Sequence, residues 1–189
     1  MAGMQVVSVN TARAEHFVAT DGQSLASAIR KRARSGPVNV GPLGLDGDEQ
    51  ADPSVHGGLS KAVYAYPQEH YEFWTTVRGQ AKVAGALQPG DCGENLTLAG
   101  LLESKVWIGD VLRFAGCELV VSEPRFPCFK FNAHMGFNQA AKLMAQSGWC
   151  GFYLAVRREG SIAAGEAFEL LPGPREVGIV ELFKAKMRK

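Results

Sequence analysis

The chain has 189 residues, of which 46% are hydrophobic and 21% are charged, and its formal net charge is +1. This length supports one substantial core, so we expect a single domain over residues 1–189. The near-neutral charge gives no reason to expect nucleic acid or a membrane surface as a partner, and no apolar run approaches the roughly 18 residues of a membrane helix.

Short apolar runs separated by turn-forming residues recur along the chain, and this pattern predicts many short strands. Residues 25–29 also fit a short helix, but the polar turn after them favours a strand. The predicted strands cover residues 5–9, 25–29, 38–40, 62–66, 94–98, 105–108, 111–114, 117–121, 151–156, 161–163, 167–171 and 178–183. Two helices are predicted, one after Pro67 and one over residues 139–146 that ends at Gly148. The fold class predicted from this pattern is mainly β (α+β), a closed β-barrel with a few interposed helices.

The segment over residues 41–61 lies between predicted strands and has no clear periodicity. A loop of this length inside a compact domain is usually either disordered or functional. It contains an acidic run over residues 46–52 and the sequence His56-Gly57-Gly58, which are too specific in composition for a spacer. The acidic run lacks the spacing of a calcium-binding EF-hand, so Asp48 is expected to cap a turn or orient a neighbour. We therefore predict a functional loop.

A second candidate segment, over residues 123–130, places one cysteine in a stiff, cationic loop. Its prolines restrict the backbone, and Arg125 and Lys130 favour the thiolate form of Cys128. The thiolate is the form that attacks electrophiles and binds metals. Many lone cysteines are only small buried apolar residues, so both interpretations stay open on spacing alone.

The cysteines are far apart in the sequence and form no CxxC pair, which argues against a zinc finger, a ferredoxin-type cluster and a thioredoxin-like site. The start of the chain lacks a basic region followed by a signal-type apolar stretch, so we expect a cytoplasmic protein with reduced thiols. The four cysteines are Cys92, Cys117, Cys128 and Cys150.

Six short motifs follow one another along the chain, at residues 47–52 (GDEQAD), 56–58 (HGG), 62–64 (AVY), 93–97 (GENLT), 108–110 (IGD) and 124–128 (PRFPC). Each is a weak signal alone, but six in this order are a strong one. Together they resemble the MOSC domain, the domain found at the C-terminus of molybdenum cofactor sulfurases, and most of all its stand-alone bacterial members. The motif-bearing core covers about residues 6–171.

This resemblance implies a β-barrel that binds a molybdenum cofactor of the molybdopterin type, with Cys128 at the position of the thiolate that ligates the metal. It also implies a reductase whose small-molecule substrates are N-hydroxylated, of the hydroxylaminopurine or amidoxime type. The chain has no GxGxxG after a strand and no cysteine cluster for iron and sulfur, so we expect an external electron-transfer protein as partner. The alternative is a sulfur-carrier or cofactor-handling module that uses a Cys128 persulfide.

Several cations and glycines are candidates for binding that cofactor. Arg125 and Lys130 are suited to its phosphate, although most such cations are simply solvated. Lys61, with the backbone amides of Gly57 and Gly58, is suited to an anion, and its alternative is an ordinary lysine at a strand edge.

Two further residues have a functional and a structural interpretation of similar weight. His56 could give a proton to a leaving hydroxide, because imidazole titrates near neutral pH, or it could bond to the backbone of its glycine-rich loop. Asn95 could bond the edge of the pterin ring, or it could close the turn at Gly93.

Overall fold

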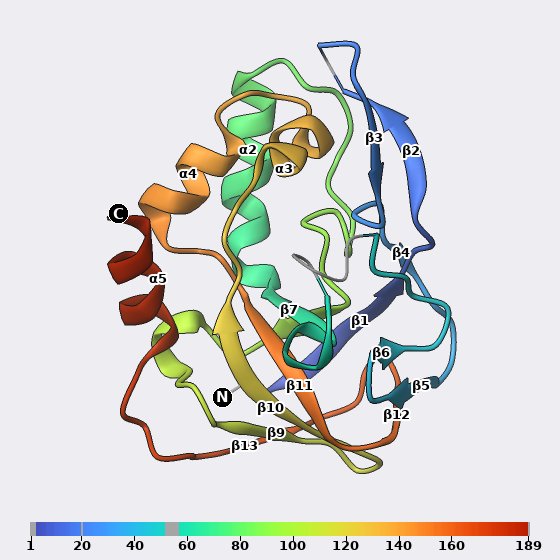
Figure 1. The fold of residues 1–189 in the computed structure, drawn as a ribbon, viewed down its shortest axis with the longest axis vertical. Helices are drawn as coiled ribbons and strands as arrows, with labels where there is room; N and C mark the ends of the chain where they lie inside the picture. Colours follow the sequence, from blue (N-terminus) through green and yellow to red (C-terminus); the bar gives the residue numbers. More distant parts are fainter. Residues whose placement is uncertain (1–2, 20, 52–56, 189) are drawn as a thin grey trace.

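The computed structural model describes residues 3–19, 21–51 and 57–188, and an eight-stranded sheet forms its centre (Figure 1). The strands of this sheet are β1 (Gln5–Thr11), β4 (Arg32–Ala33), β7 (Val63–Pro67), β8 (Leu96–Ala99), β9 (Val111–Arg113), β10 (Glu118–Pro124), β11 (Phe152–Arg158) and β13 (Glu169–Leu171). Their spatial order is β13-β9-β10-β11-β7-β8-β1-β4. The β7–β8 pair is parallel and the other neighbours are antiparallel.

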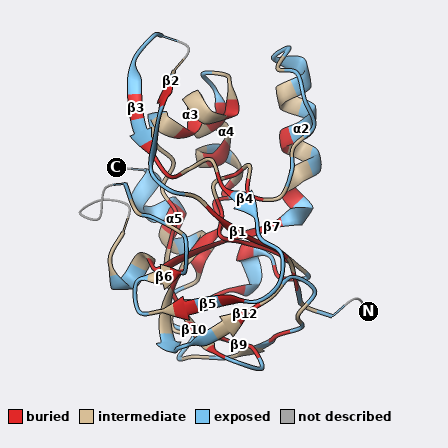
Figure 2. Cartoon of the chain, turned by 90° about the vertical axis from the view of Figure 1, so that its right-hand side faces the viewer, coloured by how far each residue is buried: buried red, intermediate tan, exposed pale blue. Residues whose placement is uncertain are grey.

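Two smaller sheets and the helices surround this sheet. One small sheet has the order β12 (Gly160–Ile162), β5 (Val38–Gly41), β6 (Gly44–Leu45), and the other pairs β2 (Glu15–Val18) with β3 (Ser24–Ser27). The α-helices are α2 (Tyr71–Gln80), α3 (Phe129–Met135), α4 (Ala140–Ser147) and α5 (Ile179–Met187), and the 3-10 turns are η1 (Leu59–Lys61), η2 (Gln68–His70) and η3 (Glu103–Lys105). Helices α2, α3 and α4 gather at one end of the sheet, and β2 and β3 extend beside them (Figures 1 and 2).

The predicted closed barrel is wrong, because the large sheet does not close on itself. Its order ends at β13 on one side and at β4 on the other. The two sides approach each other at the start of β1, where Gln5 and Ala167 form an isolated bridge instead of a ladder. The reason is geometric: the three residues of β13 pair with β9, while β1 pairs with β8 and then with β4.

Two further expectations fail where a short apolar run was taken as a strand. Residues 178–183 begin α5, in which Ile179 and Phe183 are buried one helical turn apart. Residues 105–108 begin at the last residue of η3, and among the described residues they contribute only the isolated bridge of Trp107 with Gly178. Helix α3 was not predicted. Short apolar runs do not distinguish a strand from one face of a helix, so periodicity alone was insufficient here.

Most of the other predicted elements are confirmed, with shifted boundaries. Helix α2 follows Pro67 after the short η2 turn, and α4 ends at Gly148, whose φ of 73° is a left-handed C-cap. The long loop over residues 41–61 contains β6 and η1. In the described part of the chain, no helix has the length and apolar character that a membrane span requires.

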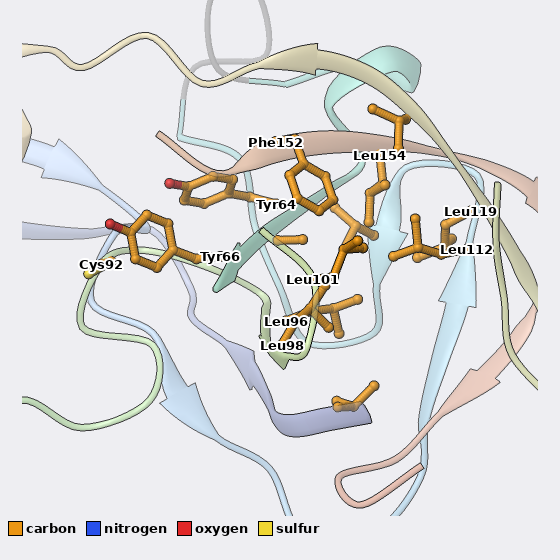
Figure 3. Close-up of a cluster of buried hydrophobic side chains, with 14 of the residues drawn as sticks. Tyr64, Tyr66, Cys92, Leu96, Leu98, Leu101, Leu112, Leu119, Phe152 and Leu154 are labelled. Carbon is orange, nitrogen blue, oxygen red and sulfur yellow. The ribbon is translucent and has the colours of Figure 1, made fainter. Parts of the chain in front are cut away.

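Strand β7 lies at the centre of the packing, because it is buried on both of its faces. On one face, Val63 and Ala65 pair with neighbours on β11 and β8, within an apolar cluster that includes Leu96, Leu98, Phe152 and Leu154 (Figure 3). On the opposite face, the Tyr66 hydroxyl accepts a hydrogen bond from Nε1 of Trp74 in α2 at 2.6 Å. The strand therefore joins the apolar core to the helical end of the molecule.

The entry into β11 depends on Gly151, which lies against β7. Its φ is +65°, and a Cβ there would lie 2.4 Å from the Ala65 carbonyl oxygen and 2.8 Å from the Tyr64 ring. We expect Gly151→Ala to lower the free energy of unfolding by about 2–5 kcal/mol, because backbone strain and overlap add. Urea denaturation measures this loss.

Gly36→Ala is the matched control, because Gly36 has a φ of +72° and no atom within 4 Å of an added Cβ. Its free energy of unfolding should fall only by the cost of the positive φ, about 1–2 kcal/mol. Equal losses in the two variants would show that the close approach to β7 is not a constraint.

Candidate functional site

A row of paired side chains crosses three adjacent strands at the candidate site. Glu123 on β10 pairs with Tyr153 on β11, and Tyr153 pairs with Tyr64 on β7. Directly paired residues in a sheet project from the same face, so these three side chains lie in a line. The register shifts between Val121 and Glu123, and such bulges redirect side chains next to sites.

Tyr64 and Tyr153 of this row line a cleft that holds about 720 Å³ of space, part of which is open solvent. Its walls come from the segment after β3, the loop after β6, the chain entering β7 and β8, and the loop that joins β10 to α3. The charged and thiol-bearing side chains that line it are Lys31, Asp48, Glu49, Lys61, Arg125, Cys128 and Lys130. Among the described residues of its lining, cations outnumber carboxylates, which suits an anionic ligand.

Cys128 is the cysteine that reaches this cleft. It is half-buried and has extended backbone immediately before α3. The other three cysteines are fully buried. Burial raises the pKa of the Cys117 thiol to about 12 and raises that of Cys92 and Cys150 as well. The buried thiols therefore stay protonated at neutral pH, which leaves Cys128 as the candidate nucleophile or metal ligand.

Arg125 is held rigidly beside the cleft and is only 7% exposed. Its guanidinium carbon lies 4.5 Å from the centre of the Phe131 ring and 5.2 Å from that of Tyr64. Its Nη1 donates long hydrogen bonds to the Tyr64 hydroxyl at 3.5 Å and to the Cys92 carbonyl at 3.4 Å. A permanent positive charge is thus fixed in an aromatic setting, as cation–π contacts favour.

The two predicted lysines, Lys61 and Lys130, also line the cleft. Lys61 Nζ lies 3.9 Å from a Glu123 carboxylate oxygen and 5.8 Å from the centre of the Tyr153 ring. Lys130 Nζ donates a hydrogen bond to the Ala26 carbonyl at 3.0 Å. This bond connects α3 to β3, so Lys130 also holds two walls of the cleft together.

Lys31 is a further cation of the cleft that sequence reasoning missed. Its Nζ lies 2.5 Å from Asp48 Oδ1, and both side chains are 8% exposed. Burial lowers the pKa of Lys31, against the attraction of Asp48. In the sequence Lys31 belonged to a polar turn, and nothing in that pattern indicated burial. Asp48 orients a neighbour, as expected.

Asn95 lines the cleft, but its amide supports the surrounding chain. Its Oδ1 accepts a hydrogen bond from the Tyr64 backbone N–H at 3.0 Å. Its Nδ2 donates to the Asn10 carbonyl at 3.2 Å and to Asp48 Oδ2 at 2.9 Å. These bonds use both hydrogens of the amide, so Asn95 positions β7 and Asp48 relative to each other.

Gly58 of the glycine-rich sequence bonds to Gln50, a residue that lines the cleft. The backbone N–H of Gly58 already donates to Gln50 Oε1 at 2.9 Å. Neither Gly57 nor Gly58 is among the described residues that line the cleft. His56 lies outside the described residues, so its expected role stays a prediction.

His134 anchors the far end of α3, and the sequence did not single it out. Its Nε2 lies 2.8 Å from the Asp91 carbonyl oxygen, which can only accept, so Nε2 carries the hydrogen. Burial lowers the pKa of His134 to about 4. The ring is therefore neutral at pH 7 and holds α3, which follows Cys128, against the loop before β8.

The family model of the MOSC domain matches residues 52–169, which are more than half of the chain. The chain belongs to the MOSC domain family. Protein YiiM of Escherichia coli is 38% identical over 155 residues, which are 82% of this chain and 68% of that protein. The crystal structure of YiiM from Geobacillus stearothermophilus has a TM-score of 0.78 and 30% identity, and the match covers 97% of this chain and 84% of that one.

A third relative of this MOSC chain is a Gibberella moniliformis protein named reductase. It is 35% identical over 154 residues, which are 81% of this chain but only 27% of that protein. The named activity therefore belongs to a much longer protein.

The neutral His134 predicts a pH dependence of stability in this MOSC chain. Its pKa of about 4 in the folded state lies below the ordinary 6.5, so the unfolded chain binds the proton first as pH falls. The stabilisation is present above pH 6.5 and is lost towards pH 4. When the pH is lowered from 8 to 5, we expect the free energy of unfolding of wild type to fall by about 2 kcal/mol more than that of His134→Gln.

Urea denaturation at the two pH values measures this difference, and His16→Gln is the control, because His16 lies exposed on β2. That control should lose as much as wild type. A His134→Gln variant with the wild-type pH dependence would contradict the assignment of a buried neutral ring.

Proposed function

We propose that this MOSC chain is a molybdenum-cofactor-binding oxidoreductase that reduces N-hydroxylated compounds of the hydroxylaminopurine or amidoxime type. The observation that carries the proposal is the position of Cys128, the one cysteine of the chain that lines the cationic cleft. The relative named reductase, whose match at 35% identity covers 81% of this chain, supports the same class of reaction.

The residues of the cleft fit such a cofactor by their chemistry. In the described part of the chain, no three His, Cys, Asp or Glu side chains gather as a metal site. The cofactor would supply the other ligands of a metal bound at Cys128, because dithiolene sulfurs are soft ligands of the same kind as a thiolate. Arg125, Lys61 and Lys130 are suited to the cofactor's phosphate, because cations pair well with phosphate oxygens.

The proposed reaction takes an N-hydroxylated amine, two electrons and two protons to the amine and water. When bound, the cofactor supplies the redox chemistry, and an external electron-transfer protein supplies the electrons. The residues of the chain hold and orient the cofactor and the substrate. Cys128 ties the cofactor to the protein, Arg125 keeps a fixed positive charge beside it, and His56 is the predicted proton donor.

Metal content tests the ligand role of Cys128. Protein made in cells competent for cofactor synthesis should carry stoichiometric molybdenum in wild type. In Cys128→Ala we expect the molybdenum content to fall at least tenfold. Even the loss of a residue that only hydrogen-bonds to a metal ligand lowers metal affinity by about 10–100-fold. Elemental analysis of the purified proteins measures this.

Cys117→Ala is the matched control, since Cys117 is a buried thiol that does not line the cleft. It should keep wild-type metal content. Equal molybdenum in Cys128→Ala and wild type would refute the ligand assignment.

Turnover is tested separately with the metal-loaded protein. Wild type should convert 6-hydroxylaminopurine to adenine and benzamidoxime to benzamidine with a reduced viologen dye as donor. Cys128→Ala should lose this activity in proportion to its metal, while Cys117→Ala keeps it. Chromatography of the products measures the rate. Metal-loaded wild type that reduces neither compound would contradict the reductase proposal.

The alternative function is a sulfur carrier or cofactor-handling module, and the partial exposure of Cys128 is the observation that favours it. A carrier needs a thiol that a partner protein can reach and no bound metal. Mass spectrometry of wild type from the same cells distinguishes the two. Metal-free protein with a persulfide on Cys128 would support the carrier and rule out the reductase.

A further inference from the structure

Tyr153 lines the same cleft as Cys128, although no sequence motif singled it out. It occupies the middle of the row across the sheet, between Glu123 on β10 and Tyr64 on β7. Its ring is fixed from two sides, with the Tyr64 ring centre at 5.2 Å and Lys61 Nζ at 5.8 Å from its own centre. The hydroxyl therefore has a defined position relative to the cleft.

The Tyr153 hydroxyl differs from the other tyrosine hydroxyls in its partners. Tyr64 donates to the Cys150 carbonyl at 2.8 Å, Tyr66 donates to the Trp149 carbonyl at 3.0 Å, and Tyr71 donates to the Glu94 carboxylate. Among the described residues, the Tyr153 hydroxyl has no hydrogen-bond partner. Tyr153 contacts Tyr64 and Lys61 through its ring.

This hydroxyl must open to the cleft. No buried side-chain oxygen or nitrogen in the described part of the chain lacks a partner, so a hydroxyl without one is accessible. The space that Tyr153 lines is the cleft itself. Burial of the ring raises the pKa of Tyr153, against the attraction of Arg125. The hydroxyl is therefore protonated at neutral pH and offers a hydrogen to a ligand.

We propose that the Tyr153 hydroxyl donates a hydrogen bond to the hydroxyl oxygen of an N-hydroxylated substrate in this cleft, a role that rests on the proposed reduction. In turnover, the N–O bond breaks as two electrons arrive from the external protein donor. The phenol proton moves to the leaving oxygen, in place of the proton predicted from His56, and that oxygen departs as water. The nitrogen takes the second proton from solvent, and the phenolate, near Arg125 and Lys61, regains its proton from water.

This role follows from the position of the phenol in a cleft that Cys128, Arg125 and Lys61 also line. The hydroxyls of the other three tyrosines are bonded within the protein, so Tyr153 differs from them in having a hydroxyl that a ligand can bond. A donor aimed into the cleft discriminates a substrate with an N-hydroxyl from the amine that lacks it, because only the former has the acceptor oxygen.

Binding tests the hydrogen bond without any turnover. Calorimetry gives the affinities of the purified protein for 6-hydroxylaminopurine and for adenine, which differ by one oxygen atom. We expect wild type to prefer the hydroxylated compound and Tyr153→Phe to lose about threefold to tenfold of that preference. Tyr66→Phe, which loses a structural hydroxyl outside the cleft, should keep the wild-type preference. An equal preference in wild type and Tyr153→Phe overturns the proposal.

Kinetics test the proton transfer. We expect kcat of Tyr153→Phe to fall about 100-fold with little change in KM and none in molybdenum content. A fluorinated tyrosine at position 153, whose phenol is more acidic, should restore turnover and move the alkaline limb of the kcat profile to lower pH. A purely structural tyrosine would not produce that shift. An unshifted limb, or an undiminished kcat in Tyr153→Phe, overturns the proton-donor role.

The two proposals fail in different ways. If metal-loaded wild type reduces neither compound, the reductase function is wrong, and the affinity ratio alone then decides whether Tyr153 binds the hydroxyl oxygen. If wild type reduces both compounds and Tyr153→Phe does so equally well, the reductase function stands and Tyr153 is excluded as the donor.

Discussion

The burial of β7 on both faces is the constraint on which the rest of the structure depends. One face packs Val63 and Ala65 into the apolar core, and the other places Tyr64 at the base of the cleft. Because side chains alternate along a strand, a shift by one residue would exchange these two sets. The Asn95 side-chain amide bonds to the Tyr64 backbone and to Asp48, and these bonds fix the position of β7 relative to the wall of the cleft. Folding and site geometry are therefore coupled through one strand.

The electrostatics of the cleft follow from that packing. Arg125 is almost fully buried, and its contacts among the described residues are neutral groups and aromatic rings. A buried charge is costly unless a counter-charge completes it, so an anionic group in the cleft would gain from binding there. Lys31 is neutralised by Asp48 in the same wall. The arrangement therefore separates a structural ion pair, Lys31 with Asp48, from Arg125, a buried cation that lines the cleft.

Much of the local structure could be predicted from the sequence, and the failures have a common physical origin. Strands such as β5, β7 and β11, and helices α2 and α4, have short-range signals in alternation, turn residues and caps. Helix α5 was missed because its first five residues read equally well as a strand, and its helical burial of Ile179 and Phe183 shows only after packing. The barrel was wrong because strand pairing depends on contacts between distant segments, which no local pattern contains.

The sequence by itself determined the family and the identity of the candidate thiol, because ordered motifs and a cysteine in a cationic loop are properties of the chain. It also pointed to Arg125, Lys61 and Lys130, which the fold brings to the same cleft. Only the tertiary structure showed that Lys31 and Tyr153 line this cleft. Only it showed that the Asn95 amide bonds to the surrounding chain. Burial and the supply of hydrogen-bond partners decide those roles, and both depend on which distant strands and loops meet around a side chain.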